Sequence, residues 1–141
     1  MSIVPAMARF VFTGRNHDDV EEALSSTFAK ACALNLPGEV WARHHVHHPL
    51  GVNSAGAQDL LPQVLDEQTV LSYTKDVPVS LLKEILLAGI PEEVIDQAAE
   101  WRDHGLRYVV VGNVSTLQPS LRRGLAATFP FAKIIRGLRR L

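Results

Sequence analysis

The sequence has a single cysteine, no long apolar run and almost no net charge. Cys32 excludes an internal disulfide and agrees with a reducing compartment. Apolar stretches fall short of the ~18 residues that indicate a membrane span, and no N-terminal segment has the basic start and apolar core of a secretion signal. A net charge of −1 favours no strongly charged partner. We therefore expect a cytoplasmic protein without a transmembrane segment and without a nucleic-acid partner.

Recognisable motifs of catalysis and cofactor binding are missing as well. The sequence has no GxGxxG, Walker or GxSxG motif, no HExxH pair and no pair of cysteines, so motifs assign no catalytic residue and no metal site. Four histidines lie close together at positions 44, 45, 47 and 48, but their spacing matches no metal-binding signature. We expect these histidines in a solvated or substrate-facing loop, and Cys32 as filler on a buried helix face.

The clearest structural signal is the stretch IPEEVIDQAAEWRDHGLRYVVVGN, residues 90–113. Pro91 and the two glutamates after it suit the first turn of a helix, and apolar residues recur at helical spacing up to Trp101. Gly105 suits the left-handed residue that ends a helix. The apolar run Tyr108–Val111 then predicts a strand. Because the run does not alternate, we expect this strand to be covered on both faces, as in a parallel sheet.

Three other segments carry weaker signals. We predict a strand over Ala8–Thr13, followed by one helix that runs to about Leu34. The run Val79–Leu87 suits a helix better than a strand, although periodicity alone does not decide it. A further helix should begin at Pro119 and be broken by Pro130, which starts the last helix.

The length of 141 residues is that of one domain, which we divide into three parts. These parts are a strand–helix unit over residues 1–35, a loop-rich insertion over residues 36–76 and closing helix–strand–helix units over residues 77–141. Proline and glycine are frequent in the insertion, which predicts loops with short helical pieces. A parallel sheet needs several strand–helix units, and only two or three are visible here. The sequence therefore predicts an α/β chain that is part of a larger fold.

The C-terminal segment is basic. Residues 119–141 contain six lysines and arginines and no acidic residue. The simpler interpretation is that these charges complement the carboxyl ends of helices. The alternative is a basic amphipathic helix at an anionic surface, which would place the protein at the periphery of a membrane.

Polar residues follow two of the predicted strands. In parallel α/β folds the functional loops lie beyond the carboxyl ends of the strands. The candidate substrate-pocket residues are therefore Thr13, Arg15, Asn113, Ser115 and Thr116. The alternative interpretation of these residues is ordinary turn chemistry.

The segment GIPEEVIDQAAEWRDHGLRYVVV resembles the ending of luciferase-like oxidoreductases, which have a G-T-P-E-E-V helix start, an amphipathic helix, a glycine turn and the last barrel strand. Two further stretches, PGEVWARHHVHHPLG and DLLPQVLDEQTVLSYTKDVP, are similar to the phthiodiolone and phenolphthiodiolone dimycocerosates ketoreductases, which are deazaflavin-dependent. Ile90 differs from the family pattern, which has a threonine that caps the helix there. Loss of such a cap typically costs ~1 kcal/mol.

This resemblance implies that the chain is the C-terminal portion of a (β/α)₈ TIM barrel, helix-rich and with two or three parallel strands. It also implies the reaction of the full-length enzyme, which is hydride transfer from a reduced deazaflavin, coenzyme F420, to the ketone of a long-chain wax lipid. Flavin mononucleotide is the alternative cofactor. The cofactor contacts of the family lie mainly in earlier strands, so no cofactor-binding residue can be carried over. We expect the chain alone neither to bind the cofactor nor to catalyse the reaction.

Two other functions are compatible with the sequence. The chain could be a non-catalytic interaction module that uses exposed apolar faces to associate with itself or with a missing barrel half. It could also be a truncated, inactive reading frame.

Overall fold

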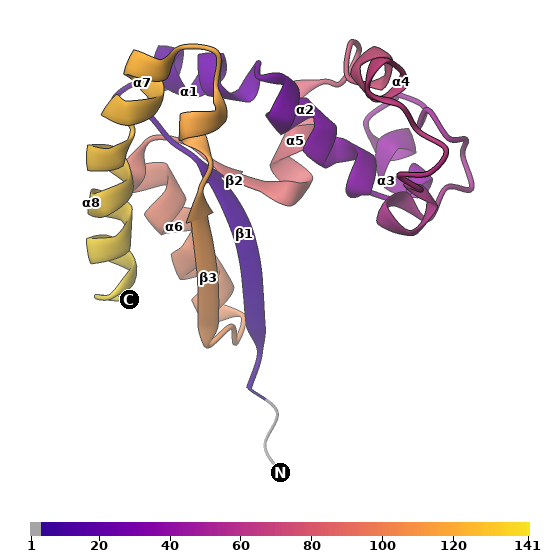
Figure 1. Ribbon diagram of the computed structural model, residues 1–141. Coiled ribbons are helices and arrows are strands. Elements are labelled where there is room, and N and C mark those ends of the chain that lie inside the picture. The colour runs from indigo at the N-terminus through magenta and orange to yellow at the C-terminus, as the bar shows by residue number, and fades with distance from the viewer. Residues whose placement is uncertain (1–3) are drawn as a thin grey trace. The chain divides into compact units, whose positions relative to one another are not determined.

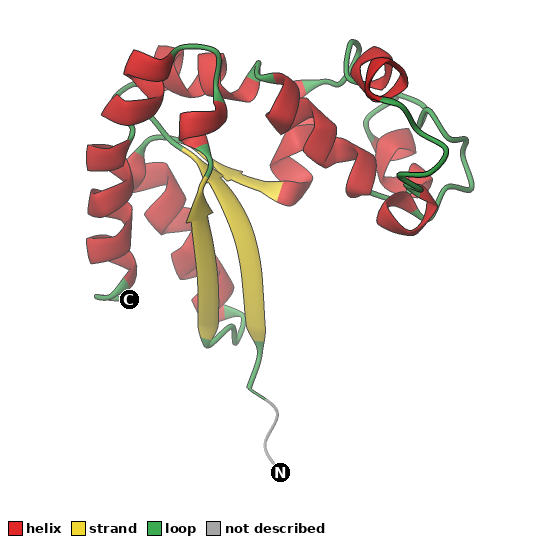
Figure 2. Cartoon of the chain, in the orientation of Figure 1, coloured by secondary structure: helices red, strands yellow, loops and turns green. Residues whose placement is uncertain are grey.

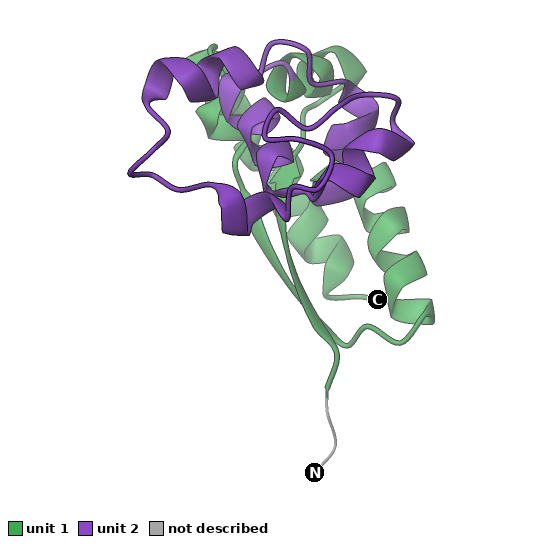
Figure 3. Cartoon of the chain, turned by 90° about the vertical axis from the view of Figure 1, so that its right-hand side faces the viewer, with its two compact units in different colours: residues 1–24, 86–141 green, residues 25–85 purple. Residues whose placement is uncertain are grey.

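A computed structural model describes residues 4–141, which form short helices and one parallel sheet (Figures 1 and 2). The chain divides into two compact units (Figure 3). The residues up to Leu24 together with Leu86–Leu141 form the sheet unit, and Ser25–Ile85 form the helical unit. None of the described helices combines the length and the apolarity that a membrane span requires.

The helical unit consists of short helices joined by loops, as its proline and glycine content predicted. Its elements are α2 (Thr27–Cys32), the 3₁₀ helix η1 (Ala33–Asn35), α3 (Gly38–Arg43), the 3₁₀ helix η2 (Gly56–Asp59), α4 (Glu67–Tyr73) and α5 (Val79–Ile85). The run Val79–Leu87 is helical as expected as far as Ile85, and its last two residues enter a strand. Cys32 is buried, and burial raises the pKa of its thiol.

The sheet unit holds the three strands of the described chain. Its elements are β1 (Ala6–Phe12), α1 (His17–Leu24), β2 (Leu86–Ala88), α6 (Pro91–Asp103), β3 (Tyr108–Asn113), the 3₁₀ helix η3 (Ser115–Leu117), α7 (Leu121–Ala126) and α8 (Thr128–Leu138). All strand pairs are parallel, which confirms the expected α/β class with two or three parallel strands.

The strands lie in the order β2-β1-β3. β1 pairs with β3 over six residues, from Ala6↔Tyr108 to Val11↔Asn113, but with β2 over only three. In a complete (β/α)₈ barrel, strands that follow one another in the sequence are neighbours. There β2 would separate β1 from β3, whereas in this chain the two long strands pair directly.

Helices α6 and α8 cover one face of the sheet (Figure 1). The fully buried side chains of this core are Val11, Leu87, Val94 and Ile134, and partly buried Trp101, Val111, Phe131 and Leu138 pack against them. Removing this apolar surface from water is the main stabilising contribution that the sheet unit offers.

On the opposite face of the sheet, the starts of β1 and β3 are exposed, whereas Phe12 and Leu86 near its other end are buried. The side chains of Phe10, Tyr108 and Val110 are 48%, 65% and 67% exposed. The strand register places Tyr108 beside Ala6 and Val110 beside Ala8, so these five residues form one apolar surface, the bare face. The expectation that β3 is covered on both faces is therefore wrong for this chain. An unbroken apolar sequence fits a strand with two covered faces, but the sheet unit packs helices against one face and leaves these side chains in solvent.

Helix α6 begins and ends as the sequence predicted. Pro91 is its first residue, and Gly105 follows its end with a φ of 98°, in the left-handed region. Ile90 offers no side-chain cap, but its N–H donates to a carboxylate oxygen of Glu93 at 3.1 Å. One half of a capping box is thus present although the family threonine is absent.

Two other helix predictions need correction. The helix expected to run to about Leu34 is interrupted, because Ser26 caps α2 by accepting the N–H of Ala29 at 3.2 Å. Serine favours helix starts over helix interiors for this reason. The boundary between the last two helices lies just before the predicted one, because α7 ends at Ala126 and α8 begins at Thr128, two residues before Pro130. Pro130 lies in the first turn of α8, where no intrahelical bond is lost by a missing N–H.

Candidate functional site

The carboxyl ends of β1 and β3 lie side by side, because the two strands are parallel and Val11 pairs with Asn113. The segments that follow them carry all five candidate residues. In open parallel sheets the ligand site lies at the point where the strand order reverses. With the order β2-β1-β3, that point falls between β1 and β3. The sheet therefore brings the candidate residues to the edge where a site is expected.

Ser115 joins the two strand ends. Its Oγ accepts the N–H of Thr13 at 2.9 Å and lies 3.5 Å from the carbonyl oxygen of Val11, to which it donates. The N–H of Ser115 in turn donates to Asn113 Oδ1 at 3.1 Å, and its carbonyl oxygen accepts Gln118 Nε2 at 2.7 Å. Ser115 is completely buried. It therefore holds the edge together and cannot itself contact a substrate.

Two buried polar atoms at this edge have no hydrogen-bond partner among the described residues. They are Thr13 Oγ1 and Gln118 Oε1. Buried polar groups are nearly always paired, so an orphaned pair of this kind indicates a place that a water or a polar ligand group completes. Gln118 was not among the predicted site residues. Only its position after β3 could have indicated it.

Arg15 is positioned by an acid at this edge. Its Nε lies 3.2 Å from Asp19 Oδ2, and its backbone N–H donates to the same oxygen at 3.4 Å. Asp19 is largely buried, and Arg123 approaches its other oxygen at 3.8 Å while also pairing with Glu22. The sequence did not single out Asp19, because nothing in its pattern distinguishes this residue from the other acids at the start of α1. Thr116 is exposed.

A cationic cleft of about 370 Å³ opens beside this edge. Its lining residues are Gly14, Arg15, Pro91, Glu92, Phe129, Pro130, Lys133 and Arg136. Lys133 pairs with Glu92, and this contact lowers the pKa of the Glu92 carboxyl. Arg136 has no acidic partner among the described residues. The cleft is at the small end of ligand pockets, so it fits an anionic group such as a phosphate rather than a whole three-ring cofactor.

His17 and Glu93 connect the starts of α1 and α6. His17 Nε2 lies 2.8 Å from Glu93 Oε1, and this hydrogen bond, with the carboxylate charge, raises the pKa of His17 above its ordinary value of 6.5. The stabilisation is present while His17 is protonated, below the unfolded-state pKa. It is lost as the pH rises through the higher folded-state pKa.

Glu93→Gln is therefore expected to lower the pKa of His17, because the replacement removes the carboxylate charge but keeps an acceptor for the Ile90 N–H. The imidazole resonances of His17, followed by NMR through a pH titration, measure this directly. Glu92→Gln is the matched control, because it removes a neighbouring charge that pairs with Lys133 instead. An unchanged midpoint in Glu93→Gln would contradict the pairing.

The histidine tract does not lie wholly in a solvated loop. His48 is 2% exposed, its Nε2 lies 3.2 Å from the Leu34 carbonyl oxygen, and its ring contacts Trp41 edge-on at 5.0 Å. His44 lies within hydrogen-bond distance of Ser80 and Glu84. The prediction of a solvated loop is therefore wrong for His48, because a neutral imidazole with backbone partners can be buried. Residues 4–141 contain no cluster of His, Cys, Asp and Glu that could hold a metal ion.

No protein-family model matches the chain. Curated relatives match all 141 residues. Phthiodiolone/phenolphthiodiolone dimycocerosates ketoreductases from Mycobacterium bovis and Mycobacterium tuberculosis are 58% identical, and one from Mycobacterium sp. strain JLS is 50% identical. The chain spans 37% of the length of these relatives. The resemblance to ketoreductases that the sequence suggested is confirmed.

One solved structure is similar in fold. It is an F420-dependent secondary alcohol dehydrogenase in complex with an F420–acetone adduct, and its match has a TM-score of 0.56 at 19% identity. The match covers 97% of this chain and 33% of that enzyme. The fold is thus similar to that of a portion of a TIM-barrel enzyme, apart from the strand order described above.

Proposed function

We propose that this chain, a relative of the phthiodiolone ketoreductases, forms the C-terminal part of a deazaflavin-dependent oxidoreductase. The complete enzyme would transfer hydride from reduced F420 to the ketone carbon of a long-chain lipid, while the ketone oxygen takes up a proton. The chain would contribute the closing strand of the barrel and part of the wall of the substrate pocket. The relatives support the reaction class, and the structural neighbour supports the cofactor class.

The observation that carries this proposal is the bare face. Phe10, Tyr108 and Val110 are apolar and exposed, although their strands have the sequence of strands with two covered faces. In a TIM barrel the inward side chains of all eight strands fill the interior in layers. Strands from the remainder of a longer protein would therefore cover the bare face and exclude water from the reaction edge.

The chain's own residues have limited roles in this proposal. Ser115 would fix the carboxyl ends of β1 and β3, and a buried water would complete the unpaired oxygens of Thr13 and Gln118 behind that edge. Arg15 and Arg136 would hold an anionic group in the cationic cleft. Reduced F420, when bound to the complete enzyme, supplies the hydride. These residues would orient the bound group and exclude water from it. The chain alone would not hold the cofactor.

The test compares the chain alone with a fusion in which the preceding part of a mycobacterial relative is joined to it. We expect no oxidation of reduced F420 by the chain with a long-chain ketone, and turnover by the fusion. Parallel titrations with F420 and flavin mononucleotide would identify the cofactor. Turnover by the chain alone would show that no further strands are needed. An inactive but folded and F420-binding fusion would refute the proposed reaction.

The bare face also favours a second candidate, a module that associates through this surface. Exposed apolar patches of this kind mark interaction sites. Sedimentation of the chain at increasing concentration, with and without Tyr108→Lys, distinguishes the two functions. A dimer that Tyr108→Lys dissociates, together with an inactive fusion, would favour the module.

A further inference from the structure

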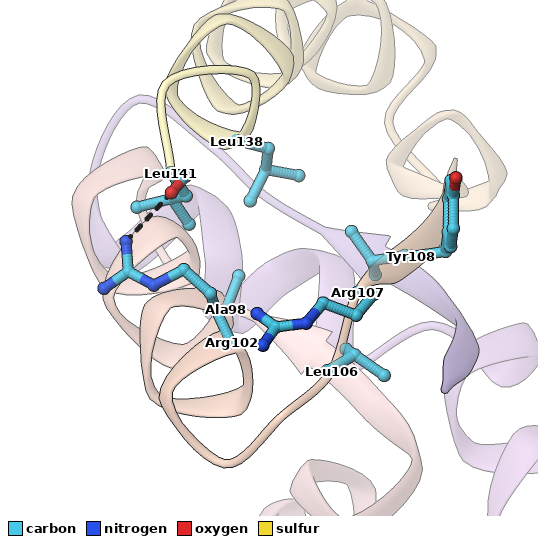
Figure 4. Close-up of a pocket in the computed structure, with 8 residues that line it drawn as sticks. Ala98, Arg102, Leu106, Arg107, Tyr108, Leu138 and Leu141 are labelled. Carbon is cyan, nitrogen blue, oxygen red and sulfur yellow. Dashed lines mark hydrogen bonds between the residues drawn. The ribbon is translucent and has the colours of Figure 1, made fainter. Parts of the chain in front are cut away.

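A second cavity lies at the other end of the sheet unit, where β3 begins (Figure 4). Its volume is about 250 Å³, and it is bounded by the end of α6, the turn before β3 and the end of α8. Its apolar walls are Ala98, Leu106, Val109, Leu138 and Leu141. Reaction sites in parallel α/β folds lie beyond the carboxyl ends of the strands. This cavity is at the amino-terminal end of β3 and is therefore separate from the candidate site.

Two arginines at this cavity differ in their partners. Arg102 pairs with Asp103 at 2.8 Å and donates to the carbonyl oxygen of Leu141 at 3.2 Å (dashed in Figure 4), so its charge is largely compensated. Arg107 has no acidic partner in the described part of the chain. Its side chain extends over the cavity toward α6 (Figure 4). Its backbone is fixed, since its N–H donates to the carbonyl oxygen of Pro5 at 3.1 Å.

The surroundings add positive charge. No acidic residue follows Asp103 in the sequence, and the exposed Arg139 and Arg140 come directly after Leu138 at the end of α8. An apolar cavity with an uncompensated guanidinium over it favours one kind of small molecule. That molecule has an anionic head and an apolar tail.

We propose that this cavity binds an amphiphile that carries an acyl chain and a single anionic head. Arg107 binds the head through its planar pair of N–H donors, and the side chains of Leu106, Val109 and Leu138 remove the first carbons of the tail from water. The cavity is smaller than most ligand pockets, so the rest of the tail runs out of its mouth. A free fatty acid and an anionic membrane lipid share this chemistry. The site is independent of hydride transfer.

The test is calorimetric titration of the full chain with sodium laurate below its micellar concentration. We expect saturable binding at one site, and Arg107→Gln is expected to weaken it by roughly tenfold or more because a charged hydrogen-bonding partner is lost. Arg122→Gln is the matched control. This substitution removes the same charge from an exposed position on α7. The affinity of the Arg122→Gln variant for laurate should stay within about twofold of that of the unmodified chain. Arg107→Lys keeps the positive charge but lacks the planar pair of N–H donors, so its affinity for laurate should lie between those of the unmodified chain and Arg107→Gln.

Vesicles distinguish the two sources of the ligand. Retention on phosphatidylglycerol vesicles but not on phosphatidylcholine vesicles, lost in Arg107→Gln, would assign a membrane lipid. Laurate binding without retention on vesicles would assign a free fatty acid. Equal losses in Arg107→Gln and Arg122→Gln, or no saturable binding to laurate and no Arg107-dependent retention, would overturn the proposal. Melting curves of each variant establish that the titrated protein is folded.

Discussion

Val11→Asp is expected to unfold the sheet unit, whereas Val110→Asp should leave the melting temperature of the isolated chain almost unchanged. Val11 is 0% exposed in the core beneath α6 and α8, and Val110 is 67% exposed on the bare face. Burying an unpaired carboxylate at Val11 should cost on the order of 4 kcal/mol or more. At Val110 the carboxylate stays in water, so the change should reflect strand preference and remain within about 1 kcal/mol.

Thermal melting by circular dichroism, with soluble yield as a second measurement, checks both variants. The same pair in the fusion with the relative's preceding part extends the test. If additional strands cover the bare face there, Val110→Asp should become nearly as damaging as Val11→Asp. Similar melting losses for the two variants in the isolated chain would mean that β3 is covered on both faces after all.

Ser115→Ala is expected to lower the free energy of unfolding by about 2 kcal/mol, because the buried N–H of Thr13 and the carbonyl oxygen of Val11 both lose a partner. For a chain of this length that corresponds to a fall of several degrees in melting temperature. Thr116→Ala is the matched control, since it truncates the neighbouring but exposed hydroxyl-bearing side chain and should have little effect.

Denaturant unfolding of both variants measures the difference. Hydrogen exchange of the Thr13 amide adds a local measurement, because its protection should fall in Ser115→Ala and persist in Thr116→Ala. Equal stability of the two variants would show that the strand ends are held by something other than Ser115.

The features that sequence predicted well are those fixed by neighbouring residues. Helix α6 and its end at Gly105 follow from a proline, two glutamates and a glycine at set spacings. The same local reasoning failed at Ser26, where serine's preference for a helix start divided a segment whose apolar spacing looked continuous. Pro130 correctly indicated the last helix but not its first residue, because a proline suits any position of the first turn.

The environment of β3 could not be predicted for a different reason. The apolar sequence of β3 fits a strand with two covered faces, but nothing within the strand itself indicates that Tyr108 and Val110 are exposed in this chain. The candidate site shows a related limit. Thr13 and Ser115 both follow strands in the sequence and are in contact in the structure, but the sequence does not show that Asp19 pairs with Arg15 or that Ser115 is buried.

The direct pairing of β1 with β3 has a consequence for assembly kinetics. Six residue pairs join these strands, and β2 holds only the end of β1. If the proposed barrel forms, β2 would enter between them, so the β1–β3 ladder would first open, and an incoming partner would compete with a contact that has already formed. Two purified parts mixed after folding should therefore associate slowly and faster at temperatures near the melting transition. Parts synthesised together, or as one polypeptide, should reach the barrel before that ladder closes.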